Sequence, residues 1–403
     1  YAFGEMTNTI RENIVGAQVV RIFNAQPKER QKFSTNNQGF YNASLKSVRY
    51  NTLFMPFNLV LIAFMVITVL FIGGGYVMDG TMPLETLIAL QSYVGLAIFP
   101  LVMMGQILIM YIQADASLTR VRDVLESVPD VKDLPDAIPI MTMKGAVGFE
   151  RVSFGYTSTN RILHDISFKV PAGKKIAIIG TTGSGKSTII NLLPRFYDVH
   201  EGTITIDDID IRRYLLKDLR KNIGIVSQET YLFNKTIAEN IAFGKEAAKI
   251  EEITEAAQIA NLHEFITSLP EGYETIIGER GTRLSGGQKQ RLSIARALII
   301  RPKILIFDDS TSSVDVETEF KIQQALDKIM ENTTTFIITQ RVSTIRDADL
   351  IAILDKGRLV GLGIHEELIE SNVLYRQIFE TLNQKQRLLG NKRGSSISTT
   401  GGK

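Results

Sequence analysis

The chain has 403 residues, of which 44% are hydrophobic, and its 45 basic and 43 acidic residues almost balance. This length and composition predict two or three folded domains and exclude a largely disordered chain. The balanced charge argues against a nucleic-acid partner, and the lack of cysteine excludes disulfides and thiolate metal sites.

The first segment begins with Tyr1 and is too polar for a signal peptide, so we expect that the natural chain begins earlier. From Met6 to Gln26 apolar residues recur every three or four positions, which is the pattern of an amphipathic helix. Pro27 is expected to break this helix. An ordinary surface helix followed by a turn fits the same pattern.

Two long uncharged stretches follow. Residues 53–77 contain no charge, and residues 84–112 contain a single acid, Glu85, at their start. Each stretch exceeds the roughly 20 residues that cross a bilayer as a helix. Pro100 is expected to kink the second helix without ending it, and the residues between the stretches fit only a tight hairpin.

The basic residues predict the orientation of this hairpin. Lys46 and Arg49 precede the first stretch and Arg120 and Arg122 follow the second, whereas the connecting turn carries no base. Both ends are therefore expected in the cytoplasm, with the hairpin in the lipid bilayer of the cell membrane as part of a multi-pass protein. The alternative, a hydrophobic hairpin inside a soluble core, is disfavoured by these lengths and flanks.

The predicted organisation has five parts. A cytoplasmic helical extension (residues 1–50) leads into the membrane hairpin and its extension (51–127), and a proline-containing linker follows (128–144). Residues 145–383 alternate short β-rich runs with helical stretches, which predicts an α/β domain. The tail, residues 384–403, contains no acid and is predicted to be disordered.

The segment Gly180-Thr181-Thr182-Gly183-Ser184-Gly185-Lys186-Ser187 predicts a phosphate-binding loop. It follows an apolar run at 176–179 and precedes a helical stretch. Glycines allow backbone amides to surround phosphate, the lysine neutralises its oxygens, and the serine hydroxyl binds Mg²⁺. The expected phosphate ligands are Gly180, Gly183, Gly185, Lys186, Ser187 and Thr188.

A second motif provides a candidate carboxylate ligand for Mg²⁺. The apolar residues 304–307 predict a buried strand that places Asp308 and Asp309 at its carboxyl end, where α/β sheets bind ligands. Asp308 is the expected Mg²⁺ ligand of an ATP site. Gln228 follows another β-like run as a polar group at a strand end, and Tyr156 could stack on adenine, although either residue alone is weak evidence.

The segment Leu284-Ser285-Gly286-Gly287-Gln288 opens a helix that carries Arg291 and Arg296. A serine at a helix start, followed by two glycines that a cap alone would not need, predicts a second anion-binding site. This second site lies about a hundred residues from the first along the chain.

From Tyr1 to about Thr381 these motifs, in this order and spacing, resemble the second half of an exporter-type ATP-binding cassette (ABC) half-transporter. They correspond to the Walker A loop, the Leu-Ser-Gly-Gly-Gln signature, the Walker B strand, and a Ser-Ser-Val-Asp loop at 312–315. The resemblance implies a helical transmembrane segment, the last part of a six-helix bundle, before an α/β nucleotide-binding domain with a helical subdomain. It implies that residues 53–77 and 84–112 are the fifth and sixth helices.

The resemblance also implies roles for particular residues. Phe23 to Lys28 would form a coupling helix, and Thr275 to Gly281 would lie near the membrane-domain contact. Tyr156 would stack on adenine, and Gln228 would be the Q-loop glutamine at the metal and the attacking water. Two cassettes would pair head to tail, so that the signature of one closes on the ATP·Mg²⁺ held by the other.

Two positions depart from the pattern of family members that hydrolyse ATP well. Asp309 stands where a glutamate base orients the attacking water, and Gln340 stands where a switch histidine is usual. Aspartate is one methylene shorter, which withdraws its carboxylate by about 1.5 Å, and a misplacement of about 1 Å can cost about a hundredfold in rate. Gln340 can donate a hydrogen bond but cannot gain a charge.

We therefore predict one subunit of a heterodimeric ABC exporter of hydrophobic, multidrug or lipid-like substrates. Its own site would turn ATP over slowly, and its intact signature would complete the competent site of a different half-transporter chain. A homodimeric exporter of lipid or peptide is an alternative. A second alternative is a soluble P-loop ATPase, which does not explain residues 53–112.

Overall fold

The structure is a computed structural model that describes residues 2–157, 160–278, 281–308 and 333–384. The chain divides into two compact units, residues 1–127 and residues 128–403. Asp309, the loop at 312–315 and the tail from 385 onward lie outside the described residues, as do Glu279 and Arg280 of the predicted 275–281 motif.

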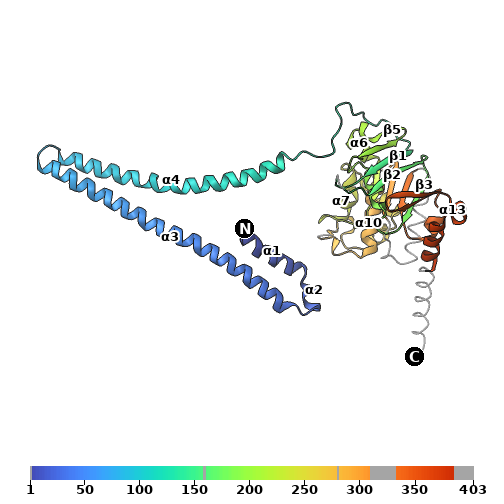
Figure 1. Cartoon of the computed structure of the whole chain (residues 1–403), viewed down its shortest axis with the longest axis horizontal. Helices are drawn as coiled ribbons and strands as arrows, with labels where there is room; N and C mark the ends of the chain where they lie inside the picture. Colours follow the sequence, from blue (N-terminus) through green and yellow to red (C-terminus); the bar gives the residue numbers. More distant parts are fainter. Residues whose placement is uncertain (1, 158–159, 279–280, 309–332, 385–403) are drawn as a thin grey trace. The chain divides into compact units, whose positions relative to one another are not determined.

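The first unit is helical (Figure 1). Two short helices, α1 (Ala2–Val15) and α2 (Ala17–Ile22), precede α3 (Gln26–Met78) of 53 residues and α4 (Leu84–Leu125) of 42 residues. At about 1.5 Å per residue, α3 is roughly 80 Å long. A hairpin joins α3 to α4, and Gly73 allows their close approach because a Cβ there would lie 2.5 Å from the Cδ1 of Leu87.

The first helices differ from the sequence prediction. The single helix expected from Met6 to Gln26 is divided at Gly16, and Pro27 lies in the first turn of α3 instead of breaking a helix. Proline is accepted there because its missing N–H would have no partner within the helix. The predicted coupling helix at Phe23 to Lys28 is not a separate element. The separate short helix is α2, and residues 26–28 belong to α3.

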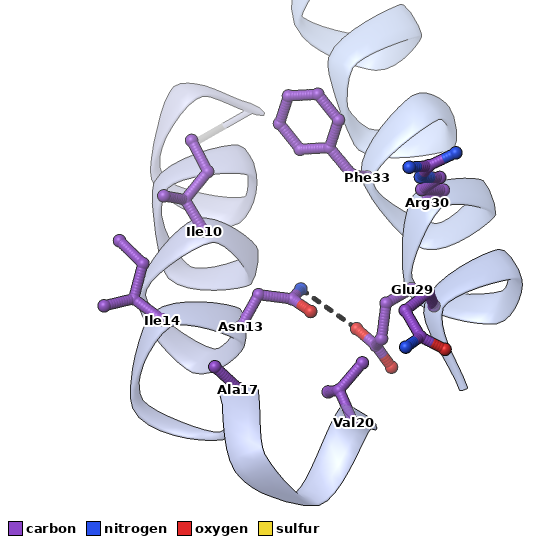
Figure 2. Close-up of a pocket in the computed structure, with 9 residues that line it drawn as sticks. Ile10, Asn13, Ile14, Ala17, Val20, Glu29, Arg30 and Phe33 are labelled. Carbon is purple, nitrogen blue, oxygen red and sulfur yellow. Dashed lines mark hydrogen bonds between the residues drawn. The ribbon is translucent and has the colours of Figure 1, made fainter. Parts of the chain in front are cut away.

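An open groove lies between α1, α2 and the start of α3 (Figure 2). Its volume is about 740 Å³, and most of its lining is apolar, including Ile10, Ile14 and Phe33. Across the groove the Nδ2 of Asn13 donates to the Oε2 of Glu29 at 3.0 Å. Ile10 and Ile14 of the predicted apolar series line this groove but remain 39% and 71% exposed.

The hairpin has the composition of a membrane segment. Leu59–Met78 is a 20-residue stretch with mean hydropathy 2.4, long and apolar enough to cross a bilayer, and Leu84–Pro100 is a shorter apolar stretch. Large apolar side chains on both helices are exposed, among them Phe71 at 83% and Leu96 at 72%. Pro100 lies inside α4 without ending it, as the sequence predicts.

Two sheets form the framework of the second unit. The six-stranded sheet has the order β10-β9-β3-β8-β7-β6, in which all pairs except β10-β9 are parallel. The four-stranded sheet has the order β2-β1-β4-β5 and is antiparallel. The strands are β1 (Val147–Phe154), β2 (Leu163–Val170), β3 (Lys175–Gly180), β4 (Glu201–Ile206), β5 (Ile209–Asp210), β6 (Ile223–Val226), β7 (Ile304–Asp308), β8 (Thr334–Ile338), β9 (Leu350–Asp355) and β10 (Arg358–Gly363).

Burial explains why the central strands are continuous apolar runs. Residues 176–179 of β3 and 304–307 of β7 are buried, as expected for parallel strands covered on both faces. The described α-helices of this unit include α5 (Lys186–Leu192), α6 (Leu216–Lys221), α7 (Ile237–Ile241), α8 (Ile250–Ile259), α9 (His263–Thr267), α10 (Gly286–Leu298), α12 (Val342–Arg346) and α13 (His365–Ser371). Helices α7, α8, α9 and α10 surround a second apolar core, the helical part of the domain.

The linker before β1 is fastened to this unit. The backbone N–H of Leu216 donates to Asp133 Oδ1 at 2.7 Å, and the N–H of Ile138 donates to the carbonyl of Arg213 at 2.7 Å. The N–H of Ile140 donates to Asp218 Oδ2 at 3.1 Å. The linker therefore follows a fixed path around α6.

Candidate nucleotide-binding site

The loop between β3 and α5 is shaped by glycines. Gly180 has φ 151°, and a Cβ there would lie 2.1 Å from the carbonyl oxygen of Leu354. Gly185 has φ 96°, and its Cβ would lie 2.6 Å from Leu163 Cδ2. Any side chain at either position would clash, so the loop keeps a tight turn directly before Lys186.

Lys186 lies over this loop. Its Nζ donates to the carbonyl oxygens of Thr181 at 2.7 Å and Gly180 at 3.0 Å. Burial lowers the pKa of Lys186, and the negative charge of Asp308 partly offsets this effect. The ends of β3 and β7 are separated in the sheet only by β8, and the charge of Asp308 acts on the Lys186 ammonium that follows β3.

The donor set beside this lysine suits Mg²⁺. Ser187 is exposed at the start of α5, Thr188 is buried, and Asp308 is half-buried at the end of β7. Hydroxyl and carboxylate oxygens are ligands that Mg²⁺ prefers. No group of three or more His, Cys, Asp and Glu side chains gathers for a metal in the part of the chain that the structure describes. Phosphate oxygens and water would therefore complete the coordination.

The carboxyl ends of four neighbouring strands carry the other predicted residues. Because β3, β8, β7 and β6 are adjacent and parallel, their ends lie along one edge of the sheet. Gln340 follows β8 and Gln228 follows β6, and both side chains are exposed. The sheet thus places Gln228 and Gln340 on the two sides of the strand that ends with Asp308.

The signature segment begins a helix, as predicted. Ser285 caps the 13-residue helix α10, where its Oγ accepts from the N–H of Gln288 at 3.3 Å and its own N–H donates to Gln288 Oε1 at 2.8 Å. Ser285 and Gly286 are exposed, whereas Gly287 is buried. The exposed part of this helix start is therefore Ser285 and Gly286, where the helix dipole favours an anion, while the N–H groups of Ser285 and Gln288 are held in the cap.

The two arginines of α10 serve the interior of the domain. Arg296 donates to the carbonyl oxygens of Asn240 and Tyr231, both at 2.8 Å, and burial lowers its pKa. Its guanidinium also lies over the rings of Phe233 and Phe243. Arg291 donates to the carbonyl of Asn261 at 2.7 Å. The Arg296 bonds join the signature helix to the segment that follows Gln228, and the Arg291 bond joins it to the turn after α8.

Tyr156 lies after β1 and is 49% exposed, with its ring nearly perpendicular to those of Phe154 and Tyr197. Half exposure suits a ring that stacks on a base. The sequence reasoning missed Tyr197, whose only signal was an aromatic residue shortly after the phosphate-loop helix.

Comparisons with known proteins agree with this geometry. Residues 2–114 match the family described as the ABC transporter transmembrane region, and residues 163–312 match the family described as ABC transporter. The solved structure of a bacterial Atm1-family ABC exporter with ATP bound superposes with a TM-score of 0.85. It shares 33% identity and covers 94% of this chain and 68% of its own.

Curated relatives give the same result. The ATP-dependent lipid A-core flippase of Syntrophus aciditrophicus is 39% identical over 98% of this chain, and the match spans 65% of the flippase. The Bacillus subtilis protein YgaD, provisionally named a multidrug export ATP-binding/permease protein, is 39% identical over 95% of this chain and 66% of its own length. The chain thus spans about two thirds of these relatives, 65% and 66% of their lengths.

The predicted fold class is confirmed by the transmembrane family match and the two-sheet nucleotide domain. The chain belongs to the ABC exporter family, as a half-transporter chain of the plasma membrane with a helical transmembrane region and a cytoplasmic nucleotide-binding domain.

Proposed function

We propose that this chain is one subunit of a dimeric, ATP-driven exporter. The observation that carries the proposal is the common sheet edge at which Lys186, Asp308, Gln228 and Gln340 are placed by β3, β7, β6 and β8. Bound ATP·Mg²⁺ would supply the phosphoanhydride bond whose hydrolysis drives transport. Lys186 would exchange its bonds to the loop carbonyls for phosphate oxygens, and Ser187 and Asp308 would hold the metal.

The signature supports the need for a second cassette. Ser285 begins α10 in the helical part, whereas Lys186 and Asp308 come from strand ends of the parallel sheet. Two phosphate-binding elements built on different parts of one domain are suited to two different nucleotides. The partner's signature would close this chain's site, and Ser285 to Gln288 would close the partner's.

We further propose that the partner is a different chain and that this chain's own site is degenerate. Two departures support the proposal, the aspartate at position 309 and the glutamine at position 340. Gln340 is exposed beside the end of the Walker B strand, from where it can donate a hydrogen bond without adding charge. Both departures weaken the same hydrolytic step, while the phosphate loop and the signature remain intact.

The transported molecule is proposed to be hydrophobic or amphipathic. The support is the exposed apolar surface of α3 and α4 and the two relatives named for lipid A-core flipping and multidrug export. The transmembrane family match removes the alternative of a soluble P-loop ATPase. A homodimeric exporter remains the second candidate, because the related Atm1-family exporter does not establish a second, different chain.

The test is the ATPase rate of the exporter in lipid vesicles, with the half-transporter that co-purifies with this chain. Asp309→Ala should leave most of the turnover, whereas Ser285→Ala should abolish most of it, since only the signature serves the competent site. The reverse order would refute the assignment of a degenerate site. Steady hydrolysis by the purified single chain would instead support the homodimer.

A further inference from the structure

Three aromatic rings gather where β1 ends and the segment after α5 passes. The Tyr156 ring lies 5.2 Å from the Phe154 ring at an interplanar angle of 85°, and 5.1 Å from the Tyr197 ring at 81°. The Phe154 and Tyr197 rings are 5.6 Å apart. Phe154 is 3% exposed, whereas Tyr156 and Tyr197 are 49% and 42% exposed. One buried ring therefore supports two rings at the surface.

The segment that carries Tyr197 is itself immobilised. Arg195, two residues earlier, is 2% exposed, and its Nε donates to the Oδ1 of Asp198, one residue after Tyr197, at 2.6 Å. The chain reaches Tyr197 directly from α5, the helix that begins with Lys186. The phosphate loop and the Tyr197 ring are thus the two ends of one short, packed segment.

The loop that carries Tyr156 is tied to the same segment. The N–H of Gly155 donates to His200 Nδ1 at 3.2 Å, and the His200 ring stacks on Phe154 at 5.5 Å. Gly155 leaves room for the tight turn, because a Cβ there would lie 2.0 Å from the carbonyl oxygen of Asn160. Residues 197–200 therefore contact the Tyr156 loop through both a ring and a backbone hydrogen bond.

We infer that Tyr197 is a positioning residue for the nucleotide base: it holds the Tyr156 ring at the tilt at which that ring stacks on adenine. The inference rests on the proposed ATP site and adds a residue to it. Rings that meet near a right angle do not stack on each other, so Tyr156 keeps its exposed half for the base. Fixing a ring before binding lowers the ordering cost of binding.

Removing the Tyr197 ring is expected to weaken only the binding of ligands that carry a base. Removing the Tyr197 ring should weaken ATP binding by about threefold to tenfold, the range that follows from immobilising one side chain. It should not weaken the binding of inorganic tripolyphosphate, which reaches the phosphate loop but has no base to stack.

The experiment uses the full chain in detergent and titrates it calorimetrically with ATP·Mg²⁺ and, separately, with tripolyphosphate·Mg²⁺. The variants are Tyr197→Ala, Tyr197→Leu, which keeps an apolar contact with Phe154, and Tyr197→Phe, which keeps the ring. Phe196→Ala is the matched control, because Phe196 is the adjacent residue and is similarly exposed at 47%, but its ring lies under Arg220. Thermal unfolding checks that each variant is folded.

Support requires a loss of ATP affinity in Tyr197→Ala and Tyr197→Leu, near-normal affinity in Tyr197→Phe and Phe196→Ala, and unchanged tripolyphosphate affinity throughout. Equal loss for both ligands would make Tyr197 a general structural residue and overturn the inference, as would unchanged ATP affinity in Tyr197→Leu. Failure of the ATP site itself would be seen differently. The unsubstituted chain would then not bind ATP, or Lys186→Ala would bind it as well as the unsubstituted chain.

Discussion

The guanidinium of Arg195 donates through Nη2 to the carbonyl oxygen of Lys132 at 3.0 Å, which joins the turn after the phosphate-loop helix to the interdomain linker. The same side chain is paired with Asp198 and is 2% exposed. Removing a buried arginine with several acceptors is destabilising, because the acceptors lose a charged partner and the buried ones gain no water in its place.

We predict that Arg195→Ala lowers the free energy of unfolding of the nucleotide-binding domain by about 2–3 kcal/mol. Chemical denaturation of the full chain in detergent, followed by circular dichroism, measures the change. Arg301→Ala is the control, since Arg301 pairs with Glu255 at the surface and is 73% exposed. An exposed pair contributes about 1 kcal/mol or less, so equal losses in the two variants would contradict the role assigned to Arg195.

Ser285 has two separable roles, a helix cap and a proposed phosphate contact. Ser285→Asp should keep the stability of the domain within about 0.5 kcal/mol, because aspartate is an equally good N-cap and its charge suits a helix start. The same change should reduce the ATPase rate of the dimer at least tenfold, because a carboxylate repels phosphate. Thermal unfolding and steady-state turnover measure the two effects, and normal turnover in this variant would exclude a phosphate contact at Ser285.

The proposed degenerate site predicts a gain of function. Asp309→Glu combined with Gln340→His should raise turnover at this chain's own site by about tenfold or more, because the base advances by one C–C bond and the switch gains a side chain able to carry charge. The rate is best measured in a dimer whose other site is inactivated at its Walker B glutamate. If the double variant is no faster than the starting chain, these two positions do not limit hydrolysis.

ATP affinity should begin to fall at a lower pH than it would at a site whose lysine is solvent-exposed. Burial lowers the pKa of Lys186, so the ammonium loses its proton at lower pH than a solvent-exposed lysine. Bound phosphate favours the charged form, and binding therefore takes up a proton and weakens as pH rises. Calorimetric titration between about pH 8 and pH 10 tests this. Lys186→Arg stays charged over that range and should bind with a flat pH profile, although more weakly.

The sequence predicted the elements whose patterns are local. The apolar run before Asp308 became a buried parallel strand, and the serine before two glycines became a capped helix start. Such features depend on few residues, so their physical signals are present in the chain itself.

The features that the sequence did not predict depend on contacts between distant residues. Pro27 could end a helix or begin one, and the choice depends on the turn at residues 23–25. The antiparallel sheet β2-β1-β4-β5 was not foreseen, because its strands are separated by the whole β3–α5 unit. The contact of Tyr197 with Tyr156 joins residues of different segments and leaves no periodic pattern.

The hydrogen bonds that hold the linker limit the distance between the end of α4 and the first anchored linker residues. Helix α4 ends at Leu125, and the first anchored linker residues are Lys132 and Asp133. The intervening chain can extend by at most about 25 Å. The short segment 126–131 therefore sets the largest separation between Leu125 and Lys132, and the hydrogen bond from Arg195 fixes the point from which that length is measured.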